Sequence, residues 1–240
     1  MTADNKCSIN FPGRLAVQQR LLPAYRAPFF DLLSGYCTGG LSVFAGIPGS
    51  EESITPAEIL QQAGYIKSSN WNPLPASSPF YILWQKGIGA WLTSFQPDVL
   101  IVEANSRYLS NRYAIRWMHA RRCPVIGWGL GVPELEGNSP FVTLRRWERT
   151  SYLRSLDGVI SYSQRGADQY REIGIPAERI WVAPNAAARR PEGFPPARPA
   201  EQPDKLTILF VGRLQARKRI DNLLHACASL PQSIQPRLII

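Results

Sequence analysis

The sequence lacks the features of several common protein classes. It contains four cysteines and two histidines in 240 residues, and no two cysteines have Cys-x-x-Cys spacing. Cysteines this sparse indicate reduced thiols and exclude a disulfide framework or a zinc finger. No run of about 18 apolar residues occurs, so no membrane-spanning helix is predicted, and no apolar signal-peptide core follows the first methionine. These absences favour a cytoplasmic protein without a metal site.

Acidic residues are scarce beside basic ones. The chain has 27 lysines and arginines against 18 aspartates and glutamates, which gives a net charge of +9. This balance is typical of a protein that binds nucleic acid, an anionic membrane surface or a phosphate-bearing small molecule, although a basic surface can also lack a specific partner. No RNP motif, zinc-finger spacing or helix-turn-helix pattern accompanies the charge, so no nucleic-acid partner is expected.

Strand-like and helix-like segments alternate along the chain, which is typical of a parallel sheet covered by helices on both faces. Strands are predicted at 14–22, 41–49, 98–103 and 123–129. The region between residues 49 and 80 is irregular, and it is expected to be a surface insertion with one short helical piece at 56–64. The order predicts an α/β fold with a Rossmann-like parallel sheet.

A basic helix is predicted between Ser139, its N-cap, and Gly158, just past its end. Its basic side chains either form a solvated face or contact an anionic membrane at the inner membrane face. These side chains are Arg145, Arg146, Arg149 and Arg154. Its apolar residues are expected to be buried: Phe141, Leu144, Trp147, Leu153 and Leu156.

A proline-rich segment divides the chain. Residues 1–188 are predicted to form an N-terminal Rossmann-like domain, and the proline-rich residues 189–204 predict an interdomain linker. Residues 205–240 predict the first strand–helix unit of a second Rossmann-like domain. This second domain is expected to be truncated, because the chain stops at Ile240.

The order of these segments resembles family 4 of the retaining glycosyltransferases, which have two Rossmann-like domains (the GT-B fold). The resemblance is most specific at 157–185, with DGVISYS, GIPAERI and Pro-Asn, and at 208–221, with ILFVGR. The segment 21–33 is similar to an opening element in part of the family. The resemblance implies sugar transfer from a nucleotide-diphosphate sugar to a carbohydrate or lipid-linked acceptor, in polysaccharide or cell-envelope glycan synthesis, without a cofactor.

Binding of the donor diphosphate is expected at Gly212, Arg213 and Lys218. The first two residues end a strand at its carboxyl edge, and Lys218 precedes a helix, which are places where phosphates bind in open α/β sheets. The resemblance implies that Arg213 and Lys218 stabilise the leaving diphosphate, and the alternative is two solvated cations. The expected role of Asp221 is structural. Two positions before it, the family has glycine where this chain has Arg219, so fewer backbone conformations are open to the turn.

Acceptor contacts are expected at the carboxyl ends of the first domain's strands. Arg26 lies in the loop after the first strand, and Glu103, Asn105 and Arg107 lie at or just after the end of the strand 98–103. Polar loop residues are common both in binding sites and in turns, so the sequence leaves both alternatives open. These four residues are the candidates for the acceptor side.

Two further candidates occupy family positions, each with a structural alternative. Ser163 either binds a ligand or caps the helix that follows, and the cap is favoured. Asn185 takes the place of the asparagine in the family's Pro-Asn-Gly, and a turn role is favoured because asparagine tolerates left-handed backbone. Many family members have a histidine after the strand 123–129, and this chain has none there.

The acidic pair with which the family holds its donor would lie downstream of Ile240. The resemblance therefore implies that the 240 residues alone bind nucleotide weakly and transfer no sugar. Two alternatives to a glycosyltransferase remain: a truncated, non-catalytic binding module and a sugar-nucleotide epimerase of the same fold. An open reading frame beyond Ile240 would favour the enzyme, and a stop codon would favour the binding module.

Overall fold

The chain divides into two compact units, Met1–Arg189 and Arg190–Ile240, which are called unit 1 and unit 2. The residues that this computed structural model describes are 10–49, 52–75, 78–133, 135, 137–184, 193–197, 206–212, 214 and 216–240. Much of the segment 189–204 lies outside them, so the linker stays a prediction. Each unit is described by itself.

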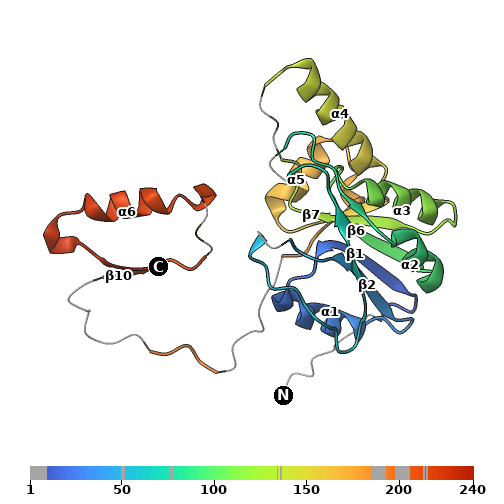
Figure 1. Ribbon diagram of the computed structural model, residues 1–240, viewed down its shortest axis with the longest axis horizontal. Coiled ribbons are helices and arrows are strands. Elements are labelled where there is room, and N and C mark those ends of the chain that lie inside the picture. The colour runs from blue at the N-terminus through green and yellow to red at the C-terminus, as the bar shows by residue number, and fades with distance from the viewer. Residues whose placement is uncertain are drawn as a thin grey trace. The chain divides into compact units, whose positions relative to one another are not determined.

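Among the described residues, unit 1 contains one parallel sheet of seven strands in the order β3-β2-β1-β6-β7-β8-β9. Figure 1 labels β2, β1, β6 and β7 of this sheet. The strands are β1 Leu15–Leu21, β2 Leu41–Gly46, β3 Gly64–Ser68, β6 Val99–Glu103, β7 Val125–Gly129, β8 Gly158–Ser161 and β9 Ile180–Val182. The predicted α/β class and the Rossmann-like parallel sheet are therefore confirmed.

Helices cover both faces of this sheet. The helices of the larger hydrophobic core contribute buried residues to one face, and α1 contributes to the other. The helices are α1 Ala27–Ser34, α2 Ile88–Phe95, α3 Leu109–His119, α4 Pro140–Arg154 and α5 Gln164–Glu172. This arrangement explains why the strands are apolar on both sides.

The central strand β1 contributes to both hydrophobic cores, because successive side chains of a strand point to opposite faces. Ala16 belongs to the larger core, whereas Leu15 and Val17 belong to the core with α1. In the larger core the rings of Phe44 and Trp91 stack with centroids 4.9 Å apart. β1 is thus enclosed along most of its length, including its carboxyl end.

The segment between residues 49 and 80 differs from the prediction. No helix forms at 56–64, and Gly64–Ser68 instead forms the edge strand β3, which pairs in parallel with β2. The short strands β4 Asn70–Trp71 and β5 Trp84–Gln85 pair in antiparallel fashion. The helix prediction was wrong because the unpaired edge of β2 offers backbone hydrogen bonds to the segment that follows, and these outweigh a weak local helix propensity.

The helix α4 begins where the sequence predicts, and the Ser139 side chain accepts a hydrogen bond from the backbone of its first turn. Of its predicted buried face, Leu153 and Leu156 are buried. The other half of the prediction was wrong, because α4 runs out from the body of unit 1 (Figure 1). The exposed fractions of the remaining apolar residues are 39% for Phe141, 59% for Leu144 and 67% for Trp147.

Unit 2 is one strand–helix–strand unit. Its elements are β10 Thr207–Leu209, α6 Ile220–Ala228 and β11 Arg237–Ile239, and the two strands pair in parallel. None of its described residues is buried, and Leu209 and Val211 are 65% and 83% exposed. A parallel pair of strands normally has both faces covered, so unit 2 by itself supplies little of its own core.

A peptide of residues 206–240 is accordingly expected to be unfolded in isolation. Chains below about 40 residues rarely fold without disulfides, metals or a partner, because they bury too little apolar surface. The measurement is circular dichroism of the peptide during a thermal scan, with unit 1 as the folded control. A cooperative melting transition of the peptide would contradict the expectation.

Candidate functional site

The carboxyl ends of β1 and β6 meet where the chain order along the sheet reverses, because the neighbours of β1 are β2 on one side and β6 on the other. Ligands of open α/β sheets bind at such a switch point. A cavity of about 340 Å³ opens at this place and is called the switch-point cavity. The structure brings four predicted acceptor-side residues into its wall: Arg26, Glu103, Asn105 and Arg107.

Other parts of the cavity wall were missed by sequence reasoning. Trp128 lies next to the last residue of β7, Tyr162 follows β8, and Arg149 comes from α4. The rule that selects Glu103, a polar or aromatic side chain at a strand's carboxyl end, would also have selected Trp128 and Tyr162. Arg149 carries no such signal, since its place in the wall depends on how α4 packs.

The Glu103 carboxyl group is held in place from several sides. Its Oε1 accepts a hydrogen bond from the Arg20 backbone N–H at 2.6 Å. The backbone N–H of Glu103 donates to Gln18 Oε1 at 3.1 Å. Burial raises the pKa of Glu103 above its ordinary value of 4.5, while the Arg20 backbone hydrogen bond and the charges of Arg20 and Arg26 act in the opposite direction. The carboxyl group is therefore preorganised before any ligand binds.

A set of hydrogen-bonded, buried amide side chains supports the position of Glu103. Gln18 and Gln85 are fully buried, and Gln18 Nε2 donates to Gln85 Oε1. Gln85 Nε2 donates to the Gln19 carbonyl and to Asn70 Oδ1, each at 3.0 Å. Because each amide finds partners, the strand β1 can carry two glutamines at the centre of a sheet. We call Gln18, Gln19, Gln85 and Asn70 the amide network.

Arg26 forms another part of the wall. Its Nη1 donates to Gln19 Oε1 at 2.8 Å, and its guanidinium lies 4.7 Å from the centroid of the Trp128 ring. The side chain is buried, with an exposed fraction of 9%. A guanidinium packed on an aromatic ring loses little mobility when it binds, so Arg26 is a rigid donor at the edge of the cavity.

Two further cavities lie in unit 1, and one of them shares wall residues with the switch-point cavity. A cavity of about 250 Å³ lies between residues 79–82 and α4, and it shares Ser106, Arg107 and Arg149 with the switch-point cavity. A third cavity, of about 670 Å³, shares Tyr81 with the second. Unit 1 therefore carries a series of neighbouring hollows that share wall residues, rather than one isolated pocket.

Ser163 takes the structural role that the sequence favoured. Its Oγ accepts a hydrogen bond from the Gly166 backbone N–H at 3.1 Å, at the start of α5. Ser163 is not part of the wall of the switch-point cavity. Asn185 lies outside the described residues, so its role stays a prediction.

Of the donor-side candidates, Arg213 lies outside the described residues. Gly212 is an exposed residue after β10, and Lys218 is an exposed residue that ends the turn Ala216–Lys218. The expected convergence of Arg213 and Lys218 on a diphosphate therefore stays a prediction.

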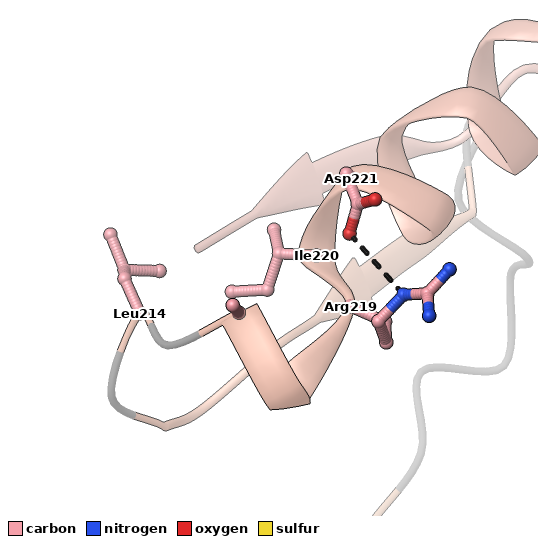
Figure 2. A pocket seen from close by; sticks show the side chains of 5 residues that line it. Leu214, Arg219, Ile220 and Asp221 are labelled. Carbon is pink, nitrogen blue, oxygen red and sulfur yellow. Dashed lines mark ion pairs between the residues drawn. The ribbon is translucent and has the colours of Figure 1, made fainter. Parts of the chain in front are cut away.

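An open hollow of about 620 Å³ lies beside the start of α6 in unit 2 (Figure 2). Arg219 in its wall has φ 51°, in the left-handed region, at the position where the family has glycine. This conformation costs a non-glycine residue roughly 1 kcal/mol. Figure 2 shows Asp221 facing Arg219, with 3.9 Å between Oδ1 and Nε, in the first turn of the helix. Asp221 thus has a structural place, where it complements the helix dipole.

Within the described part of the chain, no helix is long and apolar enough to cross a membrane. In the same residues, no group of three or more histidine, cysteine, aspartate or glutamate side chains is arranged to hold a metal ion.

Solved structures of glycosyltransferases resemble the chain. The lipopolysaccharide outer core galactosyltransferase WaaB, in its apo form, has a TM-score of 0.55 and 16% identity, over 94% of this chain and 59% of that one. Alr3699/HepE from Anabaena, in complex with UDP, has a TM-score of 0.58 and 16% identity, over 94% and 60%. The glycotransferase of kitacinnamycin has a TM-score of 0.50 and 14% identity, over 95% and 66%. The chain thus spans about three fifths of the length of the first two structures.

A search of the curated proteins finds no match. The family model Glycosyltransferase Family 4 matches residues 41–188, which include most of the sheet and most of the wall of the switch-point cavity, but not Gln19 and Arg26. The structural likeness shows a GT-B fold, and the chain belongs to glycosyltransferase family 4.

Proposed function

We propose that the chain is the acceptor side and the beginning of the donor side of a glycosyltransferase. The enzyme moves a sugar from a nucleotide-diphosphate sugar to a carbohydrate or lipid-linked acceptor, with retention at the anomeric carbon, in polysaccharide or cell-envelope glycan synthesis. The observation that carries this proposal is the switch-point cavity, which holds a preorganised carboxylate and arginines in a chain of glycosyltransferase family 4. The likeness to HepE, solved with UDP and with UDP and glucose, supports a nucleotide sugar as donor.

The cavity offers the groups that an acceptor sugar needs. In the transfer, the oxygen of an acceptor hydroxyl forms a bond to the anomeric carbon of the donor, the bond from that carbon to the diphosphate breaks, and the hydroxyl proton passes to the departing diphosphate. The Glu103 carboxylate accepts a hydrogen bond from an acceptor hydroxyl and orients its oxygen, while the guanidinium of Arg26 donates to other hydroxyls. Arg213 and Lys218 stabilise the negative charge on the departing diphosphate, so no cofactor is required.

The proposal is tested by following the labelled sugar. The protein is produced from the reading frame continued beyond Ile240 as far as it stays open. It is then incubated with labelled nucleotide sugars and with membrane and polysaccharide fractions. We expect label in the acceptor and one nucleoside diphosphate released for each sugar transferred. Isomerised nucleotide sugar without acceptor would instead indicate an epimerase. Nucleotide binding without any turnover would indicate a non-catalytic binding module.

We also propose that α4 contacts an anionic membrane surface. Leu144 and Trp147 are 59% and 67% exposed, beside Arg145 and Arg146 on the same helix. Aromatic and aliphatic side chains insert into the interfacial region of a bilayer, and arginines attract anionic lipids. This arrangement suits an enzyme whose acceptor is carried by a lipid.

Replacement of Leu144 and Trp147 by serine is expected to weaken binding to phosphatidylglycerol vesicles by about tenfold or more, since each side chain loses apolar burial. Vesicle flotation measures the bound fraction. Trp181→Ser is the control, because Trp181 is also exposed on unit 1 but lies on β9. Equal binding by the double variant and the wild type would contradict a membrane role for α4.

A further inference from the structure

The cavity between residues 79–82 and α4 has an apolar wall. The rings of Phe80 and Phe141 come from these two segments, with centroids 5.2 Å apart, and Leu109 and Leu144 extend the wall. Phe80 is 63% exposed and Leu144 is 59% exposed. Contiguous exposed apolar side chains beside a cavity are typical of a surface that binds an apolar group. We call this cavity the α4 groove.

Three arginines line the same groove: Arg107, Arg145 and Arg149. Burial, and next the positive charges of Arg145 and Arg107, lower the pKa of Arg149. Each of the three forms a contact with a neutral group. These contacts are the Tyr81 ring 5.7 Å from Arg107 Cζ, the Phe141 ring 5.6 Å from Arg145 Cζ and the Pro133 carbonyl oxygen bound by Arg149.

An acidic residue in the wall of the groove, Glu148, only partly offsets these positive charges: it raises the pKa of Arg149, while burial and the neighbouring arginines lower it. Glu148 lines the groove, but its carboxylate accepts hydrogen bonds from Arg112 and from Ser106 Oγ. Among the described residues, none of the three groove arginines forms a salt bridge with a carboxylate. Clustered guanidinium groups without carboxylate partners are complementary to a phosphate, which they bind through charge-assisted hydrogen bonds.

The α4 groove and the switch-point cavity are adjacent. Ser106, Arg107 and Arg149 line both, so the arginines stand between an apolar surface and the polar pocket at Glu103. Apolar surface, cations and a hydroxyl-binding carboxylate thus follow one another in the order of a lipid chain, its phosphate and a sugar. A free sugar phosphate would leave the apolar wall uncovered, and a neutral lipid would leave the arginines without an anion.

We propose that the acceptor is a sugar linked through phosphate or diphosphate to an apolar chain. The chain lies in the α4 groove, the phosphate lies against Arg107, Arg145 and Arg149, and the sugar reaches the switch-point cavity. This inference rests on the proposed function and specifies its acceptor.

Three soluble probes separate the parts of such an acceptor: farnesyl phosphate, farnesol and glucose 1-phosphate. Their binding to the 240-residue chain is measured by titration calorimetry at concentrations below micelle formation. We expect farnesyl phosphate to bind at least about tenfold more tightly than either other probe, because it alone supplies both the anion and the apolar chain. Equal affinity for farnesyl phosphate and farnesol would overturn the phosphate site. Equal affinity for farnesyl phosphate and glucose 1-phosphate would overturn the apolar site.

Two neighbouring arginines provide a matched pair of variants. Arg145→Gln and Arg146→Gln each remove one positive charge from α4, but only Arg145 lines the groove, whereas Arg146 is exposed and donates to the Leu135 carbonyl at 3.2 Å. We expect Arg145→Gln to weaken farnesyl phosphate binding by about tenfold and Arg146→Gln by less than about twofold. Equal weakening by both would mean that the helix attracts anions through its overall charge, and it would overturn the proposal.

Failure of this inference is distinguishable from failure of the proposed function. An enzyme that uses a phosphate-free acceptor would still transfer label from a nucleotide sugar, but its chain would not prefer farnesyl phosphate. A chain that prefers farnesyl phosphate and whose gene product transfers no sugar would retain the binding site and contradict the transferase. Thermal unfolding of each variant, measured alongside binding, separates lost contacts from lost folding.

Discussion

Gln85→Leu is expected to lower the free energy of unfolding by about 3 kcal/mol. Gln85 is fully buried and contacts Gln18, Asn70 and the Gln19 carbonyl through its amide group. Leucine has a similar size but no polar atoms, so Gln18 Nε2, the Gln19 carbonyl and Asn70 Oδ1 would each lose a hydrogen bond in a buried or partly buried place. Each unsatisfied buried group costs about 1–3 kcal/mol. Urea unfolding at neutral pH, followed by tryptophan fluorescence, measures the loss.

The control for this variant is Gln61→Leu, which makes the same chemical change at an exposed residue of unit 1. Substitutions at such surface positions change stability by less than about 0.5 kcal/mol. A similar loss in both variants would mean that the change of residue type, and not the amide network, determines stability. A loss below about 1 kcal/mol for Gln85→Leu would mean that water replaces the missing partners.

Glu103→Gln is expected to reduce the efficiency of sugar transfer by about 30-fold. A hydrogen bond to a charged group contributes about 1.5–3 kcal/mol, and about 1.4 kcal/mol corresponds to tenfold. Glutamine preserves the shape of the side chain and an oxygen that can accept from the Arg20 backbone, but it removes the negative charge. Glu58→Gln is the control, because Glu58 is exposed on the same unit. An equal loss in the control would exclude a specific role for Glu103.

The raised pKa of Glu103 also predicts how pH acts on this residue. Between its ordinary value of 4.5 and the raised value, the folded chain holds a proton that the unfolded chain has released. The contribution of Glu103 to stability therefore falls as pH rises through this window. Glu103→Gln should lose this dependence and be at least as stable as the wild type at neutral pH. Transfer by the wild type should increase as the carboxyl group ionises, and the variant should lack this increase.

Denaturant unfolding at several pH values checks the stability part of this prediction. A Glu103→Gln variant that is less stable than the wild type at neutral pH would show that attraction by Arg20 and Arg26 outweighs the cost of burying the carboxylate. A pH–rate profile that is the same for both proteins would show that transfer does not depend on ionisation of Glu103.

Much of unit 1 is predictable from local sequence patterns. The strand 98–103 is apolar and bounded by charged residues, and parallel strands end at one edge of a sheet. These two facts suffice to place Glu103 and Asn105 at the same edge as Arg26, which follows β1. A helix N-cap also depends only on residues close together in the sequence, so Ser139 and Ser163 were assigned correctly as helix N-caps.

The remaining features depend on contacts between distant segments. Two glutamines in β1 look unfavourable for a buried strand. Nothing near Gln18 in the sequence shows that Gln85, far along the chain, pairs with its side chain, while Arg26 binds the side chain of Gln19. The periodicity of α4 correctly identifies an apolar face, but it does not tell whether the protein covers that face. Leu144 and Trp147 are exposed because the helix runs beyond the sheet.

Steady-state kinetics of the wild type and Glu103→Gln, with donor and acceptor varied separately, test the central assignment of the switch-point cavity to the acceptor. If Glu103 orients the acceptor, the variant lowers kcat/KM for the acceptor by about 30-fold and changes KM for the nucleotide sugar by less than about twofold. A raised KM for the nucleotide sugar with an unchanged kcat/KM for the acceptor would contradict this account.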